Sequence, residues 1–404
     1  AGGDITTQDL NSWSYSSSGN SGNGGQITLN AEQISPSNAQ KITINTFSVG
    51  QTGSEKGGEV NITTNNLSNT EILTLSSHSE SGEITIKSHP QKQLQINDSS
   101  IITGKNFRTE KTIKIEIKDR YGNIIDSEEI TFSEKFDVEN TQGRSGNVYL
   151  RSYGDLNLKN VTIESDTKGD NDAGNVNIES QAGTIISLNN TKILSTTKAK
   201  GNAGNITITT PQNIELTNNS TLQADTQGSG KAGTITVQSQ TLNLNEETSL
   251  TTQTSGAGAP GKIEIEAETI DIGKDAQISA TITQESTNKE GGGSIEIDTN
   301  TLNISGTLGI FAETEGLADA GDLILSPYKE GSQLDINFSN NGFISASTKS
   351  KGDGGKISII APENINIAGQ GEIRVTTNNT GNAGTIKIET QNLTTSDQVS
   401  ITAS

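Results

Sequence analysis

The chain has 404 residues, of which only 29% are hydrophobic, and its formal net charge at pH 7 is −20. Globular chains contain about 45–50% apolar residues counted with glycine, so a compact enzyme with a large central core is not expected. The absence of cysteine excludes disulfides and thiolate metal sites. No stretch approaches the ~20 apolar residues of a membrane helix, so membrane insertion is not expected. The acidic balance also disfavours nucleic acid and anionic lipid surfaces as partners.

The first residues, Ala1-Gly2-Gly3-Asp4-Ile5, resemble the middle of a motif rather than a beginning, and neither an initiator methionine nor a signal peptide precedes them. We therefore expect a processed or internal segment of a larger protein, with a trimmed chain as the alternative. Any targeting signal would then lie outside this sequence.

A glycine signature recurs along the whole chain. It consists of a small residue, a glycine, any residue and then two aliphatic residues at alternate positions, as in Ala203-Gly204-Asn205-Ile206-Thr207-Ile208. From position 146 onward it returns about every 29 residues, which indicates a repeat architecture. The signature glycine falls at positions 3, 25, 58, 82, 146, 174, 204, 233, 261, 293, 321, 355 and 384.

Each repeat contains three short runs in which apolar residues alternate with polar ones. Alternation of this kind is typical of a strand with one buried face. Three strands and three corners in each repeat predict an all-β fold, a right-handed parallel β-helix whose stacked coils share one narrow core. In one repeat the predicted inward residues are Ile206, Ile208, Ile214, Leu216 and Leu222.

The corners carry their own residue types. Asparagine or glycine joins the second and third runs, as at Asn218-Asn219, Asn340-Asn341 and Ser305-Gly306, where a left-handed conformation is expected. Prolines follow the first run, where a corner does not need the N–H that proline lacks. These prolines are Pro90, Pro211, Pro327 and Pro362.

One segment interrupts the repeat between Gly82 and Gly146. Residues 105–139 are dense in charge and contain Phe107, Tyr121, Phe132 and Phe136, which we expect to contact other molecules. The pattern strand, turn, strand indicates either a projecting β-hairpin or an irregular extra coil. The predicted organisation is an N-terminal set of coils (1–104), this insertion (105–145) and a regular C-terminal set of coils (146–404).

The repeat resembles that of filamentous-haemagglutinin-type exoproteins, especially cyanobacterial ones. The segments that carry the resemblance are Gly3-Asp4-Ile5-Thr6-Thr7-Gln8, Ser21-Gly22-Asn23-Gly24-Gly25-Gln26-Ile27, Gly143-Arg144-Ser145-Gly146-Asn147-Val148 and Gly201-Asn202-Ala203-Gly204-Asn205-Ile206. The resemblance implies a right-handed β-helix, two-partner secretion and a location outside the cell or on the bacterial surface. It carries over no catalytic residue.

Four carboxylates occupy matched positions in neighbouring repeats: Glu264 and Glu266 in one, Glu296 and Asp298 in the next. In a stacked solenoid these pairs lie above one another, and like charges so placed need a counter-charge or screening. They are therefore candidate ligands for Ca²⁺. The alternatives are a solvated face neutralised by Lys262 and salt, or the acid pair of a polysaccharide-cleaving protein.

Other candidate sites are weaker. Asp166, Asp170 and Asp172 lie at alternate positions of a corner, which is compatible with a cation site or with a polar turn. The two histidines, His78 and His89, have no partners spaced for zinc or for a catalytic triad. The outward positions of the third run do not form a threonine ladder, which disfavours ice binding. They read Gln223, Thr251, Ser279, Phe311, Ser345 and Arg374.

Repetition without a convergent polar pocket favours a non-enzymatic structural or adhesive surface protein without a cofactor. The alternative is a polysaccharide-binding or polysaccharide-cleaving β-helix, which requires acids, a base and aromatic platforms on one face. The aromatic residues look too scattered for that outside 105–139. The expected partners are further copies of the chain, because uncapped solenoid ends and the aromatic insertion both favour fibre assembly, and cell-surface glycans.

Overall fold

The computed structural model describes the chain except for residues 1–2, 8, 16–21, 38–40, 50–54, 77–78, 105–110, 119–123, 133–142, 168, 290, 330, 332 and 379. At positions 13, 15, 49, 111–118 and 124–132 it describes the backbone alone. Over this part of the chain every regular element is a strand, and no helix is present that is long and apolar enough to cross a membrane.

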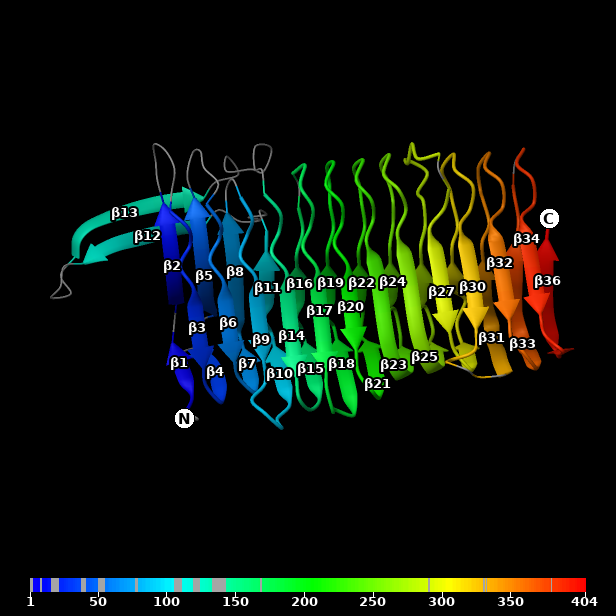
Figure 1. The fold of residues 1–404 in the computed structure, drawn as a ribbon, viewed down its shortest axis with the longest axis horizontal. Helices are drawn as coiled ribbons and strands as arrows, with labels where there is room; N and C mark the ends of the chain where they lie inside the picture. Colours follow the sequence, from blue (N-terminus) through cyan, green and yellow to red (C-terminus); the bar gives the residue numbers. More distant parts are fainter. Residues whose placement is uncertain are drawn as a thin grey trace.

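The strands stack in parallel as a β-solenoid of about 12 turns with a spacing near 29 residues. Figure 1 shows them side by side along the long axis, from blue at the N-terminal end to red at the C-terminal end. The predicted parallel β-solenoid is therefore confirmed. Three columns of strands form three faces of the rod.

The first face contains the strands that follow each glycine signature. They are β3 (Ile27–Asn30), β6 (Val60–Thr63), β9 (Ile84–Lys87), β14 (Val148–Ser152), β17 (Val176–Ser180), β20 (Ile206–Thr209), the first halves of β23 (Thr234–Leu244) and β25 (Lys262–Ile272), β27 (Ser294–Asp298), β30 (Asp322–Ser326), β32 (Lys356–Ile360) and β34 (Thr385–Glu389).

The second face contains the second run of each coil. Its strands are β1 (Ile5–Thr7), β4 (Gln33–Pro36), β7 (Asn66–Ser68), β10 (Leu94–Asn97), β15 (Leu156–Lys159), β18 (Ile185–Asn189), β21 (Asn213–Thr217), the second halves of β23 and β25, β28 (Thr301–Ile304), the first parts of β31 (Gln333–Ser345) and β33 (Asn364–Val375), and β35 (Asn392–Thr395).

The third face contains the third run. Its strands are β2 (Asp9–Tyr15), β5 (Ile42–Val49), β8 (Thr70–Ser76), β11 (Ser100–Thr103), β16 (Thr162–Glu164), β19 (Lys192–Leu194), β22 (Thr221–Gln223), β24 (Ser249–Thr251), β26 (Gln277–Ser279), β29 (Gly309–Phe311), the last parts of β31 and β33, and β36 (Gln398–Ala403).

The core is a continuous column of aliphatic side chains, one or two from each strand of a coil. All five predicted inward residues of the coil that starts at Gly204 are fully buried: Ile206, Ile208, Ile214, Leu216 and Leu222. Each stacks on an aliphatic residue of the next coil, as Ile208 does on Val237. This narrow core explains how a chain with so few hydrophobic residues becomes ordered.

The signature glycines stack directly on one another. A Cβ placed on Gly204 would lie 2.1 Å from the carbonyl oxygen of Gly174, and one on Gly174 would lie 2.0 Å from that of Gly146. Real Cβ atoms do not approach backbone this closely, so glycine is required where successive coils pass. Gly3 is outside the stack, because Ile5 pairs with Ile34 in the second face and nothing lies within 4 Å of a Cβ on Gly3. The prediction that it opens a coil of the series is wrong.

The corner between the second and third faces takes the expected left-handed conformation at Asn218 and Asn219, with φ of 53° and 62°. Asn340 and Asn341 do the same. At Ser305-Gly306 the prediction is wrong, since neither residue has a positive φ. Asparagine side chains also link successive corners, with Asn190 Nδ2 donating to Asn160 Oδ1 at 2.8 Å.

A threonine column follows the third face, a feature that the sequence analysis missed. The column consists of Thr167, Thr197, Thr226, Thr254, Ile282, Thr314, Thr348 and Thr377, each bridged in parallel to the next. From Thr167 to Thr348 these side chains are buried, unlike the outward ladder that ice binding would need. Several of their hydroxyls have no hydrogen-bond partner within the described part of the chain, among them Thr197, Thr226 and Thr314.

Between β11 and β14 the insertion contains β12 (Lys111–Lys118) and β13 (Ile124–Phe132). They pair antiparallel with each other in a sheet of their own, separate from the 34-stranded solenoid sheet. The hairpin pattern, rather than an irregular coil, therefore describes these two strands (Figure 1).

The glycine stack generates the first prediction. Gly204→Ala should lower the stability of the surrounding coils by about 1–3 kcal/mol, because the new methyl group overpacks against the Gly174 carbonyl. Gly154→Ala is the matched control, since its Cβ would meet atoms no closer than 3.4 Å. Thermal unfolding and amide hydrogen exchange measure both. Equal melting temperatures for the two variants would contradict the stacking constraint.

Candidate functional site

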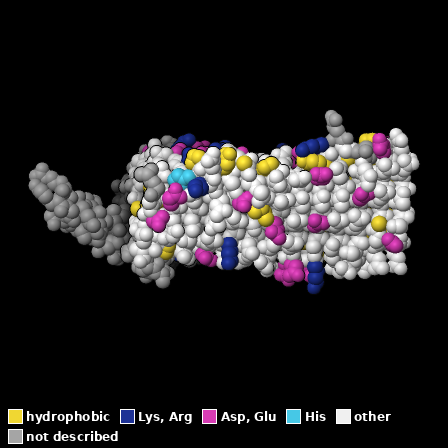
Figure 2. Space-filling model, turned by 90° about the horizontal axis from the view of Figure 1, so that it is seen from below, with side chains coloured by type: hydrophobic (Ala, Val, Ile, Leu, Met, Phe, Trp, Pro, Cys, Tyr) yellow, Lys and Arg dark blue, Asp and Glu magenta, His cyan; other side chains and the backbone are white. Residues whose placement is uncertain are grey.

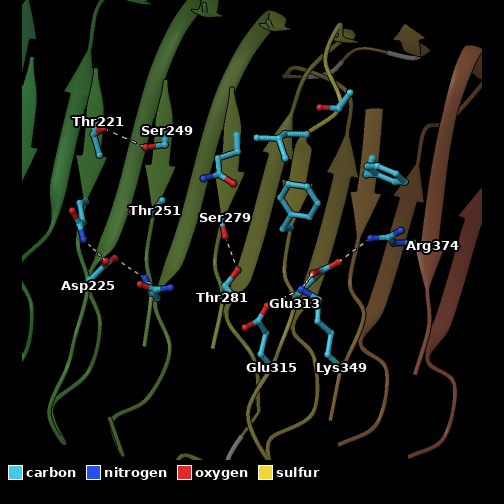
Figure 3. Close-up of a pocket in the computed structure, with 17 residues that line it drawn as sticks. Thr221, Asp225, Ser249, Thr251, Ser279, Thr281, Glu313, Glu315, Lys349 and Arg374 are labelled. Atoms are coloured by element: carbon cyan, nitrogen blue, oxygen red, sulfur yellow. Dashed lines mark hydrogen bonds and ion pairs between the residues drawn. The ribbon is translucent and has the colours of Figure 1, made fainter. Parts of the chain in front are cut away.

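A groove runs along the third face across six neighbouring coils, with a volume of about 620 Å³. It crosses β22, β24, β26 and β29 and the last parts of β31 and β33 (Figure 3). We call it the third-face groove. It is lined by Thr221, Gln223, Asp225, Ser249, Thr251, Gln253, Gln277, Ser279, Thr281, Thr307, Leu308, Phe311, Glu313, Glu315, Phe343, Lys349 and Arg374.

Apart from Asp225, the part of the groove nearer the N-terminus is made of uncharged hydroxyl and amide side chains at matched positions of successive coils. Gln223, Thr251 and Ser279 are paired neighbours in the ladder. Ser249 Oγ donates to Thr221 Oγ1 at 3.3 Å, and the hydroxyls of Ser279 and Thr281 lie 2.5 Å apart (Figure 3). This part of the groove therefore presents a periodic array of donors and acceptors without charge.

Asp225 is the acidic residue that lines this part of the groove, and only 5% of its surface is exposed. Burial raises the pKa of its carboxyl group to about 6. The backbone N–H of Gln253, 2.6 Å from Oδ1, and the Gln223 amide act in the opposite direction, while the Asp166 carboxylate adds to the rise. Near neutral pH this acid is only partly compensated, so its ionisation weakens the fold.

The part nearer the C-terminus holds two acids and two bases in mutual contact. Lys349 Nζ lies 2.6 Å from Glu315 Oε1, and Arg374 Nη2 lies 3.5 Å from Glu313 Oε1. The Glu313 side chain is 10% exposed and also accepts a hydrogen bond from the Ser345 hydroxyl. The hydrogen bond to Glu315 raises the pKa of Lys349. Because each carboxylate has a cation beside it, this part of the groove is close to neutral overall.

Two phenylalanines complete the same groove, Phe311 and Phe343. The guanidinium carbon of Arg374 lies 4.4 Å from the centroid of the Phe343 ring, a cation–π contact. Two aromatic residues outside 105–139 thus line one groove, but Phe311 is only 9% exposed, so the expectation that aromatic platforms are lacking there stays a prediction. The predicted alignment of Phe311 with Ser345 is confirmed by the ladder, although both side chains are buried and not exposed as an outward position would be. Phe343, two residues before Ser345, lies in the adjoining column and could have been found by extending the alignment.

The four carboxylates proposed for Ca²⁺ lie together on the first face, beside a small pocket of about 180 Å³. As predicted, Glu264 pairs with Glu296 in the ladder, and Glu266 with Asp298. Lys262 lies between two of them, with Nζ 2.7 Å from Glu264 Oε1 and 2.7 Å from Glu296 Oε2. These hydrogen bonds raise the pKa of Lys262.

The other two carboxylates bond to neutral groups. Glu266 accepts from the Gln238 amide at 3.3 Å, and Asp298 from the Ser326 hydroxyl at 2.5 Å. Among the described residues, no group of three or more His, Asp or Glu side chains is arranged to hold a metal ion. Ca²⁺ binding at this cluster stays a prediction, in which a cation would compete with Lys262.

The remaining sequence candidates do not converge. In the acidic corner, each carboxylate bonds to the next coil: Asp166 to the Thr196 N–H, Asp170 to Lys200 and Asp172 to the Asn202 N–H. That pattern fits a polar turn. Phe107, Tyr121 and Phe136 lie outside the described residues, and Phe132 ends β13 without a described side chain. Their role in contacts stays a prediction.

The raised pKa of Asp225 predicts that substituting this residue stabilises the protein in a pH-dependent way. Because its folded pKa lies above the ordinary 3.8, stability falls as the pH rises through about 6. Asp225→Asn should therefore stabilise the protein at pH 7 by up to about 3 kcal/mol and should have little effect at pH 3.5. Urea unfolding at the two pH values measures this. Asp353→Asn is the control. Hydrogen bonds from Asn382 lower the pKa of Asp353, so removing this carboxylate should not stabilise the protein at pH 7. If Asp225→Asn stabilises the protein equally at both pH values, the raised pKa of Asp225 is not the cause.

The competition at the first face can be measured with Lys262→Met. Removing the ammonium group leaves Glu264 and Glu296 without their counter-charge, so millimolar Ca²⁺ should raise the melting temperature of this variant more than that of the parent. Adding Glu296→Gln should abolish the rise. If Ca²⁺ leaves the melting temperature of all three proteins unchanged, the result argues against a cation site.

The chain matches no protein-family model, no curated protein and no solved structure.

Proposed function

We propose that this chain is the rod of a non-enzymatic structural or adhesive protein that acts outside the cell, on a bacterial surface. The observation that carries the proposal is the continuity of the stack, in which one ladder and one core extend from β1 to β36. Repeats of this kind contact only their neighbours, which suits a molecule that spaces or joins other surfaces. The resemblance of the glycine signature to filamentous-haemagglutinin-type repeats supports the extracellular setting and export by two-partner secretion.

The surface supports the same proposal. On the side seen in Figure 2, charged side chains of both signs are scattered over a surface made mostly of uncharged polar and backbone atoms. Acidic residues outnumber basic ones by 48 to 28, which keeps a long rod soluble and disfavours nucleic acid and anionic lipid as partners.

Self-association through the insertion is part of the proposal. Among the described strands, β12 and β13 pair only with each other, so both outer edges of this two-stranded sheet are open to further pairing. The isoleucines at 113, 115 and 117 alternate along β12, a pattern typical of a strand that buries one face. Lateral pairing of the insertion between rods would join them into fibres.

We expect that residues 105–142 can be removed without breaking the stack, because the described residues on either side of them lie close together. A Cβ on Gly104 would lie 2.6 Å from the Ser145 hydroxyl oxygen, so a short linker can join the two sides. Replacing 105–142 with Gly-Ser-Gly should leave the melting temperature nearly unchanged and should abolish lateral assembly. Light scattering and electron microscopy on purified protein measure the assembly.

A second variant separates the two kinds of contact. Replacing Phe107, Tyr121, Phe132 and Phe136 with serine keeps both strands and removes the aromatic groups. Assembly that survives this change but not the deletion indicates edge pairing. A parent protein that stays monodisperse at high concentration, or a deletion variant that assembles like the parent, would contradict the proposal.

The third-face groove favours a second candidate function, the binding of polysaccharide. Acids, bases and the half-buried Phe343 ring lie together in this groove, which supports a polysaccharide-binding role. An adhesive rod and a polysaccharide-binding rod are compatible, since adhesion needs a ligand.

A further inference from the structure

We propose that the third-face groove binds a neutral, extended polysaccharide chain that lies along the axis of the rod. The inference deepens the proposed adhesive function by naming a ligand class and a site. It rests on three features of the groove: its periodicity, its charge and its aromatic residues.

The periodicity matches an extended polymer of sugars. Coils follow one another at about 4.8 Å, so the six coils of the groove cover about 24 Å. Each coil from β22 to β26 repeats a hydroxyl or amide at the same place, as in the series Gln223, Thr251 and Ser279. One sugar of an extended β-1,4-linked glycan is about as long as this spacing. Because successive sugars are turned over, every second sugar can meet equivalent donors and acceptors on every second coil. A peptide strand advances only about 3.3 Å per residue and falls out of step with the coils.

The groove offers side chains rather than free backbone. The N–H and C=O groups of β22, β24 and β26 are bound within the parallel ladder, as in the pairing of Leu222 with Leu250. A peptide could not add to the sheet here, because strand addition needs an open edge. Hydroxyl-rich chains need only side-chain partners, which the groove supplies.

The charge of the groove selects a neutral chain. The carboxylates of Glu313 and Glu315 lie beside Arg374 and Lys349, so neither base is free to neutralise an incoming anion. Asp225 adds negative charge above about pH 6. A uronate or sulfated polymer would therefore meet repulsion without compensation, in a protein whose net charge is already −20.

Phe343 supplies the apolar surface that a sugar ring needs, whereas Phe311, of which only 9% is exposed, forms part of the groove wall. Phe343 is half-buried, and Arg374 holds its ring by the cation–π contact at 4.4 Å. Pockets for small organic ligands combine such aromatic walls with a few placed polar groups. The apolar face of a pyranose ring packs on an aromatic ring, while its hydroxyls bond to the neighbouring polar side chains.

The test uses β-1,4-linked gluco-oligosaccharides of two to six units as the probe for an extended neutral chain. Isothermal titration calorimetry on the full chain should show affinity that rises with length up to about the six units that the coils can accommodate. Malto-oligosaccharides, which coil, and oligogalacturonates, which are charged, should bind at least about tenfold more weakly, a difference of about 1.4 kcal/mol.

Matched substitutions locate the site. Thr251→Arg places a long side chain in the part of the groove nearer the N-terminus, and Thr236→Arg places the same side chain on the first face of the same rod. Thr251→Arg should weaken binding of the hexasaccharide at least about tenfold, whereas Thr236→Arg should leave it within about twofold. Phe343→Leu, which keeps an apolar side chain without a ring, should also weaken binding. Circular dichroism melting of all three variants checks that the rod is intact.

Three outcomes overturn the inference. The hexasaccharide does not bind at millimolar concentration, the oligogalacturonate binds as tightly as the hexasaccharide, or the two arginine variants lose the same amount of affinity for the hexasaccharide. Rods that assemble without binding the hexasaccharide would remove the groove inference and leave the structural function. Release of reducing sugar from the bound chain would keep the glycan inference and overturn the non-enzymatic function.

Discussion

The whole structure depends on how closely one coil lies on the next. The parallel ladder sets that distance, and the signature glycines permit it, because a side chain at Gly204 would collide with the carbonyl oxygen of Gly174. Once the coils are in contact, each buried aliphatic residue lies over its counterpart, as Ile208 does over Val237. The core is therefore a property of the stack, and a single coil could not form it alone.

The same contact sorts the sequence into columns with separate roles. Inward columns accept aliphatic residues and, at one corner, buried threonines such as Thr226. Asparagines at another corner take the left-handed conformation and bond to the coil beside them, as Asn190 does to Asn160. Outward columns have no such requirement. They are free to change from coil to coil, and both candidate sites lie on them.

The two candidate sites neutralise neighbouring carboxylates in different ways. On the first face, Lys262 bridges Glu264 and Glu296, and the other two carboxylates bond to neutral groups. In the third-face groove, Arg374 reaches Glu313 across an intervening coil and also covers Phe343. The first arrangement is a local neutralisation at the surface. The second forms the wall of a groove, which is why we assign the glycan to the third face.

The sequence by itself determined the solenoid, because period-two alternation and a glycine at nearly constant spacing leave few other ways to bury Ile206, Ile208 and Leu222. It also determined which carboxylates stack, since Glu264 and Glu296 lie at equal distances from their glycines. The sequence wrongly predicted that Gly3 opens a coil, because a short motif does not indicate on which face the next strand lies. Only the tertiary structure decided the charge pairing and the groove. Arg374, Glu313 and Phe343 come from three different coils, and corners of unequal length separate them in the chain. Their contacts depend on side-chain reach across the stack, which the alternation of a single strand does not encode.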